Sequence, residues 1–221
     1  MVPIRENLVP KDKYAIKCPY TRTPTRVVIH NTANDAPAAN EISYMRYNDL
    51  EISFHYAVDD VNIVQGIPEN RNAWASGDGH GKGNMEGIHI EICYSKSGGE
   101  KFDKAEQNAA EFTANLLKKY GWGIDKVTKH RDYDGKYCPH RTLDRGWQRF
   151  LSMVKRYMEP AKAPVASKFT PYLIRKNCRD ALNIRKGPST NYGILGQIKD
   201  TLRYTIVEER SGPGSHKGWG R

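Results

Sequence analysis

Short apolar runs separated by polar loops predict a chain that alternates between strands and helices. Four segments rich in β-branched and aromatic residues are predicted as strands: 26–30, 53–58, 62–67 and 88–93. Three segments with apolar residues at helical spacing are predicted as helices: 39–50, 103–121 and 144–158. The Gly-rich stretch 74–87 is predicted as a long surface loop. This order of elements indicates an α/β fold in which helices cover a β-sheet.

Two of these segments carry more detailed signals. Asp103 with Glu106 three residues later resembles a capping box, and Gly121 is expected to end the same helix. In strand 88–93 the three isoleucines alternate with other residues, so they share one face and Glu91 points from the opposite face. Glu91 is therefore either a salt-bridged surface carboxylate or part of a site.

The composition is that of a globular protein. The chain has 221 residues, of which 38% are hydrophobic and 27% charged, and this excludes disordered and collagen-like classes. No window approaches the ~18 apolar residues that span a bilayer, so we expect no membrane insertion. The first residues, Met1 to Glu6, lack the apolar core of a signal peptide, so we expect the chain to be made and retained in the cytoplasm until it is released.

Charge divides the chain unevenly. Residues 1–160 carry 23 basic and 21 acidic side chains, net +2, whereas residues 161–221 carry 12 and 4, net +8. The Pro- and Ala-rich stretch 160–168 lies between them and is typical of a linker. We therefore predict two domains, 1–159 and 169–221, of which the second is attracted to a polyanion such as nucleic acid, anionic lipid or an acidic wall polymer.

The four cysteines are scattered and form no CxxC pair. In a chain without an export signal they are expected to be reduced. For three of them, Cys18, Cys93 and Cys178, the simplest interpretation is a small buried hydrophobic residue.

The polar segment 129–140 concentrates three potential metal ligands, His130, Cys138 and His140, within eleven residues. A catalytic zinc ion has three protein ligands and leaves one position for water. One more donor must come from elsewhere in the fold, and His30 is the best candidate because it lies where a buried strand runs into a loop. The alternative for any single histidine is a surface or core residue without a metal.

The chain resembles the zinc-dependent N-acetylmuramoyl-L-alanine amidases of the Amidase-2 type, which share a fold with the peptidoglycan recognition proteins. The resemblance covers residues 20 to 158 and is carried, in chain order, by Val28-Ile29-His30-Asn31-Thr32-Ala33, Phe54-His55-Tyr56, Trp74, Gly87-Ile88-His89-Ile90-Glu91 and Lys136-Tyr137-Cys138-Pro139-His140. It implies a central mixed β-sheet flanked by helices.

The resemblance also implies the site. Zn²⁺ is expected on His30, His130 and Cys138, with Glu91 as general base and Lys136 stabilising the oxyanion. For Lys136 the alternative is a solvated lysine in a charged loop.

Several positions depart from the commonest family pattern. Trp74 is followed by Ala75 where many relatives have a histidine, and His80 of the same loop is a possible substitute in substrate contact. Phe54 stands where relatives often have a tyrosine. The remaining histidines are expected to pack behind the metal ligands or to orient them: His55, His89 and His140.

Residues 180–198 alternate short apolar runs around a Gly-Pro turn, which predicts a small antiparallel β structure. The segment Leu182 to Ser189 resembles a bacterial SH3 (SH3b) domain, and this resemblance implies binding to the cell wall. Such domains continue beyond a sequence of the type found at 218–221, so we expect an incomplete domain that folds poorly or pairs through an exposed strand edge.

These observations predict a peptidoglycan hydrolase that cleaves the bond between N-acetylmuramic acid and L-alanine, with the bacterial cell wall as its partner. A phage or prophage endolysin fits best. The alternatives are an exported autolysin, a cytoplasmic recycling amidase and a non-catalytic peptidoglycan-binding protein, against which Cys138 argues. A nucleic-acid binder would fit the pI of about 9.4, but the sequence contains no nucleic-acid recognition motif. We therefore expect no nucleic acid as a partner.

Overall fold

The computed structural model describes residues 1–159, 171–175, 180–207, 209–210, 212–213 and 219–220. Its internal contacts divide the chain into two units, Met1–Ala161 and Lys162–Arg221. The expected linker at 160–168 and Cys178 lie outside the described residues. The roles assigned to the two domains stay predictions.

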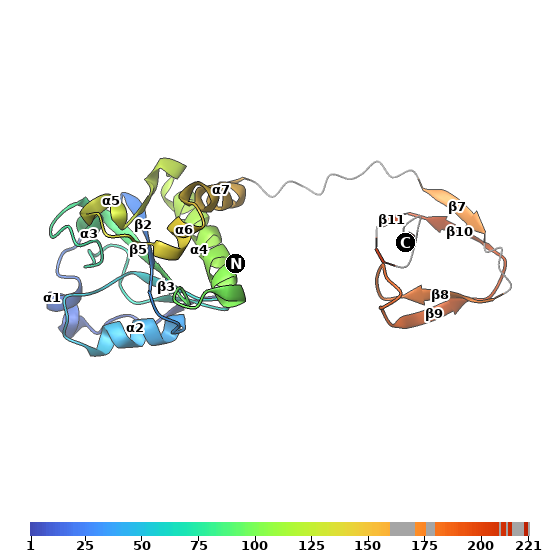
Figure 1. Cartoon of the computed structure of the whole chain (residues 1–221), viewed down its shortest axis with the longest axis horizontal. Helices are drawn as coiled ribbons and strands as arrows, with labels where there is room; N and C mark the ends of the chain where they lie inside the picture. Colours follow the sequence, from blue (N-terminus) through green and yellow to red (C-terminus); the bar gives the residue numbers. More distant parts are fainter. Residues whose placement is uncertain (160–170, 176–179, 208, 211, 214–218, 221) are drawn as a thin grey trace. The chain divides into compact units, whose positions relative to one another are not determined.

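The first unit is built on a six-stranded sheet with the strand order β1-β4-β3-β5-β2-β6 (Figure 1). The strands are β1 (Ile4–Glu6), β2 (Arg26–Asn31), β3 (Tyr56–Val58), β4 (Ile63–Gln65), β5 (Gly87–Ile92) and β6 (Val127–Lys129). Only β3 and β4 pair in antiparallel fashion, and the other neighbours are parallel. The sheet is therefore mixed, as expected.

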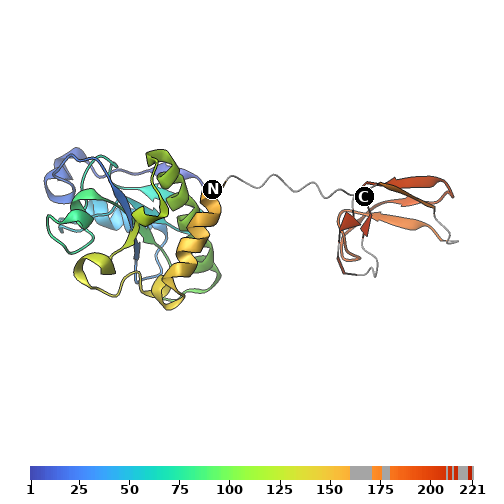
Figure 2. The same ribbon diagram turned by 90° about the horizontal axis from the view of Figure 1, so that it is seen from above.

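Helices pack around this sheet (Figure 2). They are α1 (Tyr14–Lys17), α2 (Ala38–Tyr47), α3 (Lys82–Glu86), α4 (Gly99–Tyr120), α5 (Arg131–Asp134), α6 (His140–Asp144) and α7 (Trp147–Met158), with short 3-10 helices at Lys11–Lys13 and Ile124–Lys126. The long helix α4 packs on β5 and β3 and carries α7 on its side, whereas α2 packs on β3 and β4. No helix in the described part of the chain combines the length and apolar character needed to cross a membrane.

The central strands β2 and β5 carry two of the predicted site residues, His30 and Glu91. Parallel strands in the middle of a sheet are covered on both faces, which explains why Val27, Val28 and Ile29 are all fully buried. His30 pairs in register with Glu91, so both side chains project from the same face of the sheet.

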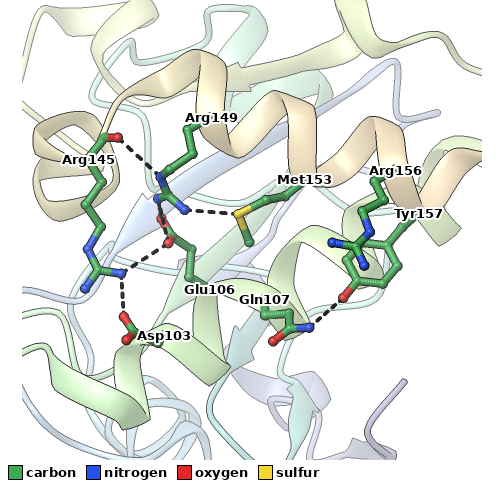
Figure 3. A pocket seen from close by; sticks show the side chains of 8 residues that line it. All are labelled: Asp103, Glu106, Gln107, Arg145, Arg149, Met153, Arg156 and Tyr157. Atoms are coloured by element: carbon green, nitrogen blue, oxygen red, sulfur yellow. Dashed lines mark hydrogen bonds and ion pairs between the residues drawn. The ribbon is translucent and has the colours of Figure 1, made fainter. Parts of the chain in front are cut away.

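The start of α4 differs from the prediction. The helix begins at Gly99, after Gly98 with a φ of 75°, and not at a capping box on Asp103. Positive φ favours glycine, so the two-glycine turn sets the start of the helix. Glu106 is buried and points at α7 instead, where both of its oxygens accept hydrogen bonds from Arg149 (Figure 3). The predicted end is confirmed, because Gly121 takes the left-handed conformation.

The boundaries of other elements also differ from the predicted ones. The predicted loop 74–87 contains helix α3, whose first main-chain N–H groups are capped by the carboxylate of Asp78, which accepts from Gly83 at 2.7 Å and Asn84 at 3.1 Å. The predicted strands 53–58 and 62–67 pair with each other only over Tyr56–Val58 and Ile63–Gln65, and the last predicted helix, 144–158, begins three residues later, at Trp147, as α7. Cys18 and Cys93 are free and fully buried, as expected.

In the second unit the described strands pair two by two. They are β7 (Tyr172–Arg175), β8 (Leu182–Arg185), β9 (Ile194–Ile198), β10 (Arg203–Ile206), β11 (Glu209–Arg210) and β12 (Trp219–Gly220). β7 pairs with β10, β8 with β9 and β11 with β12, all antiparallel. The antiparallel pattern predicted at 180–198 is confirmed by β8 and β9, whereas the SH3b assignment and the poor folding stay predictions.

Candidate active site

Three side chains, from one strand and two loops, converge beside the central strands. His30 is the penultimate residue of β2, His130 follows β6, and Cys138 lies in the loop after α5. One ligand atom of each lies within 4.8 Å of the others, and all three residues are buried. Main-chain bonds fix the two loops in place, because His130 N–H donates to Ile29 at 3.2 Å and Arg131 N–H donates to the carbonyl of Cys138 at 3.0 Å.

The donor set fits a zinc ion. The two Nδ1 atoms of His30 and His130 face each other at 3.1 Å. Two nitrogens bound at ~2.0–2.1 Å to one tetrahedral ion would lie ~3.3 Å apart, so this spacing suits a shared cation. The second nitrogen of each ring, Nε2, also has a hydrogen-bonding partner. Nε2 of His30 lies 2.9 Å from Nδ1 of His89, and Nε2 of His130 lies 3.0 Å from Asp134.

Burial sets the protonation of these ligands. Desolvation lowers the pKa of His30 well below its usual value and also lowers the pKa of His130, so both rings are neutral at pH 7. Burial, and then the charge of Glu91, raise the pKa of the Cys138 thiol to about 12. The nitrogens are therefore ready to bind a metal, whereas the sulfur must first lose a proton.

Glu91 lies beside this cluster on β5. Its Oε2 atom is buried and has no hydrogen-bond partner in the described structure. Burial, and then the neighbouring charge of Glu41, raise the pKa of Glu91 to about 8, and Lys136 opposes them. A strongly perturbed, unpartnered carboxyl of this kind is typical of a functional group and not of a salt-bridged surface residue.

Lys136 is exposed and lies in the loop between His130 and Cys138. Its main-chain N–H donates to Asp134 at 2.8 Å. Its positive charge lowers the pKa of His30, His130 and Glu91, which places the side chain within electrostatic reach of the whole cluster. The structure therefore brings together all five residues singled out from the sequence.

The cluster opens into a groove of about 1210 Å³. Glu91, His130, Lys136 and Cys138 line it, and His30 lies behind them. One face of α2 forms part of its wall, through Asn40, Glu41, Tyr44 and Met45, together with Asn48 directly after the helix. The loop after β4 forms another part through Trp74, Ala75, Gly77, Gly79 and His80. A groove of this size suits an extended substrate.

The remaining histidines have separate places. Fully buried His89 supports His30, and the Nδ1 atom of His55 accepts the main-chain N–H of His89 at 3.0 Å. Exposed His80 lies at the rim beside Tyr20, at 3.2 Å from its hydroxyl. His140 lies in the groove near the carbonyl of Ser95 and is not part of the three-ligand cluster.

Two acidic residues at the site, Asp134 and Glu41, are not predicted from the sequence. Asp134 is four residues after His130 and contacts its outer nitrogen; the spacing itself was the signal, because i and i+4 residues of a helical turn are neighbours. Glu41 lies on α2 and had no signal in the sequence, since only the folded groove brings it near Glu91.

Comparison with known proteins identifies the family. The model of the Amidase_2 family, described as N-acetylmuramoyl-L-alanine amidase, matches residues 20–141. The chain belongs to the Amidase_2 family. N-acetylmuramoyl-L-alanine amidase XlyB of Bacillus subtilis (strain 168) is 51% identical over 181 residues, which are 79% of this chain and 57% of XlyB. N-acetylmuramoyl-L-alanine amidase CwlA of the same organism is 50% identical over 190 residues, covering 82% of this chain and 70% of CwlA.

The fold agrees with this Amidase_2 assignment. The structure of PlyL superposes with a TM-score of 0.68 at 52% identity, over 69% of this chain and 97% of PlyL. The chain spans little more than half the length of XlyB.

Proposed function

We propose that this Amidase_2 protein hydrolyses peptidoglycan at the amide bond between N-acetylmuramic acid and the L-alanine of the stem peptide. The observation that carries the proposal is the convergence of His30, His130 and Cys138 beside Glu91 at the floor of one groove. The names of XlyB and CwlA support the substrate class.

The ligand set is that of a zinc site with room for water. A zinc ion on His30, His130 and Cys138 would supply a Lewis acid and lower the pKa of a water molecule to near neutrality. His89 and Asp134 would hold the two imidazole rings in the tautomer that leaves Nδ1 free to bind.

The remaining groups of the site have complementary charges for amide hydrolysis. Glu91 accepts the proton of the attacking water and passes it to the leaving amine. The charge of Lys136 lowers the pKa of the Glu91 carboxyl, and a bound zinc ion would lower it further. Both favour the ionised form that a base needs. The ammonium of Lys136 stabilises the negative oxygen that forms when the amide carbonyl is attacked.

The second unit is proposed to bind the cell wall as an SH3b-like domain. Residues 161–221 carry a net charge of +8, which suits the acidic polymers of a wall. With such a unit the protein would act as an endolysin, made in the host cytoplasm and reaching the wall after its release at lysis.

A binding-only protein on the same fold is the second candidate. It would need the groove but not the metal ligands, and a complete ligand set with a perturbed, unpartnered Glu91 disfavours it.

The test uses the full chain, loaded with zinc, on purified cell walls. We expect new amino ends without new reducing ends, and about one zinc per chain. Cys138→Ala should lower both zinc content and lysis, whereas Cys18→Ala, which removes a buried thiol outside the cluster, should keep the zinc. Full lysis by metal-free protein would refute the scheme, and reducing ends without amino ends would show a glycosidase.

A further inference from the structure

One buried carboxylate faces the groove without a cationic partner. Glu41 lies on the face of α2 that lines the groove, and only 9% of its surface is exposed. No ion pair of the described residues includes it. Its hydrogen-bond partner is the side chain of Asn34, a neutral amide that also lines the groove.

The other buried acidic residues of this unit are satisfied differently. Glu106 is paired with Arg149 and Arg145. Asp59 accepts main-chain N–H groups, among them that of Ala38 at 3.0 Å, which caps α2. Glu41 alone among these three is left with one neutral donor, and it is the one that lines the groove.

Burying a carboxylate without a counter-charge costs free energy. Its desolvation is offset only by a cation or by several strong donors, and burial accordingly raises the pKa of Glu41. Such a cost is tolerated where a ligand supplies the missing charge. Because its charge also acts on Glu91, Glu41 lies close enough to the base to contact the same substrate molecule.

We propose that Glu41 is a specificity-determining residue that binds a protonated amine on the peptide part of the substrate. The inference rests on the proposed amidase function and goes beyond it by naming the substrate class. The stem peptide of peptidoglycan contains a diamino acid, whose free side-chain amine supplies this cation. Stems with that amine free are preferred over stems in which it is acylated by a cross-link.

The experiment compares two synthetic substrates that differ in one charge. They are muramyl-L-alanyl-D-isoglutaminyl-L-lysine and the same compound with its lysine amine acetylated. The zinc-loaded full chain should show a KM at least tenfold lower for the free amine. Glu41→Gln, which keeps the shape and removes the charge, should bring the two KM values within about twofold of each other.

The matched control is Glu51→Gln, which removes an exposed carboxylate from the same groove. It should retain the preference for the amine. Dissociation constants of both compounds for the zinc-loaded Glu91→Gln protein give the same comparison without turnover, so the result does not depend on fast cleavage of small substrates.

Each other outcome overturns the proposal. A wild-type protein that does not discriminate between the compounds has no amine subsite. An equal loss on both compounds in Glu41→Gln would assign Glu41 to the stability of α2 or to the setting of Glu91. Failure of the amidase function itself is distinguishable, because then neither compound nor purified wall yields new amino ends.

Discussion

The Nε2 atom of His30 lies 2.9 Å from Nδ1 of His89, and both rings are buried. With a metal ion on Nδ1 of His30, the proton of this ring is on Nε2, which donates it to His89. His89 thus favours the tautomer in which His30 can bind the proposed metal. The main-chain N–H of His89 in turn donates to Nδ1 of His55 at 3.0 Å, which holds the main chain of β5 in place at His89.

We expect His89→Leu to weaken zinc binding by about 10- to 100-fold, because the ring of His30 loses the acceptor that orients it. Competition with a fluorescent chelator measures the affinity. His140→Gln is the control, since His140 lies in the same groove but does not touch a ligand. An unchanged zinc affinity in His89→Leu would show that packing alone orients His30.

The three residues of the proposed metal site could be singled out from the sequence, whereas the residues around them could not. His30 could be chosen because a β-branched run ends on it, and the strand end is a local property. The roles of Asp134 and Glu41 depend on how loops and α2 close over the sheet, which no periodicity encodes. Likewise the apparent capping box at Asp103 and Glu106 was wrong because Glu106 has a stronger partner, Arg149, 43 residues away.

The number of protons released when zinc binds should report the ionisation of the Cys138 thiol. Burial holds the pKa of the Cys138 thiol near 12, while His30 and His130 are already neutral. In a Glu91→Gln background the thiol is the one group of the cluster that must ionise. We expect at least one proton released per zinc, and an affinity that rises at least tenfold per pH unit between pH 6.5 and 8.5, because a water molecule on the zinc would add its own proton as its pKa is passed. Calorimetry in buffers of different ionisation enthalpy counts the protons, and a count of zero would mean that the thiol is ionised without metal.

Lys136 should act in turnover and not in metal binding. Lys136→Met removes the charge that stabilises the oxyanion, and we expect kcat to fall by about 10²- to 10³-fold with zinc content unchanged. Lys136→Arg should recover part of the loss because it keeps the charge. Lys126→Met is the control, because Lys126 is exposed and its one ion pair among the described residues is with Asp125. A change in KM alone would instead assign Lys136 to substrate binding.

The buried carboxyl of Glu91 should make the metal-free protein sensitive to pH. Its pKa is raised from 4.5 to about 8, so the folded chain keeps a proton that the unfolded chain releases. Stability is therefore lost as pH rises from about 4.5 to 8, by on the order of a few kcal/mol. Glu91→Gln removes this loss, so relative to wild type it should gain stability across that window and show no gain below pH 4.5. Urea denaturation in EDTA at several pH values checks this, with the exposed Glu100→Gln as control; a gain that is independent of pH would contradict it.

The ion pair between α4 and α7 should hold the first unit together. Glu106 is 1% exposed and accepts hydrogen bonds from Arg149 at 2.7 and 2.6 Å (Figure 3). Removing Arg149 takes both hydrogen bonds from a buried carboxylate and leaves Arg145, at 3.6 Å, as its cation, so we expect Arg149→Met to destabilise the unit by about 1.5–3 kcal/mol. Arg156→Met is the control, because Arg156 lines the same pocket but takes part in no ion pair of the described residues.

The double variant Glu106→Met with Arg149→Met separates charge from packing. Because it removes both charges, it should recover most of the stability that Arg149→Met loses. Urea unfolding followed by helical circular dichroism reports on this unit, since every helix of the described chain lies in it. If Arg149→Met costs no more than Arg156→Met, the carboxylate of Glu106 is hydrated in solution and the two helices are held by their apolar residues alone.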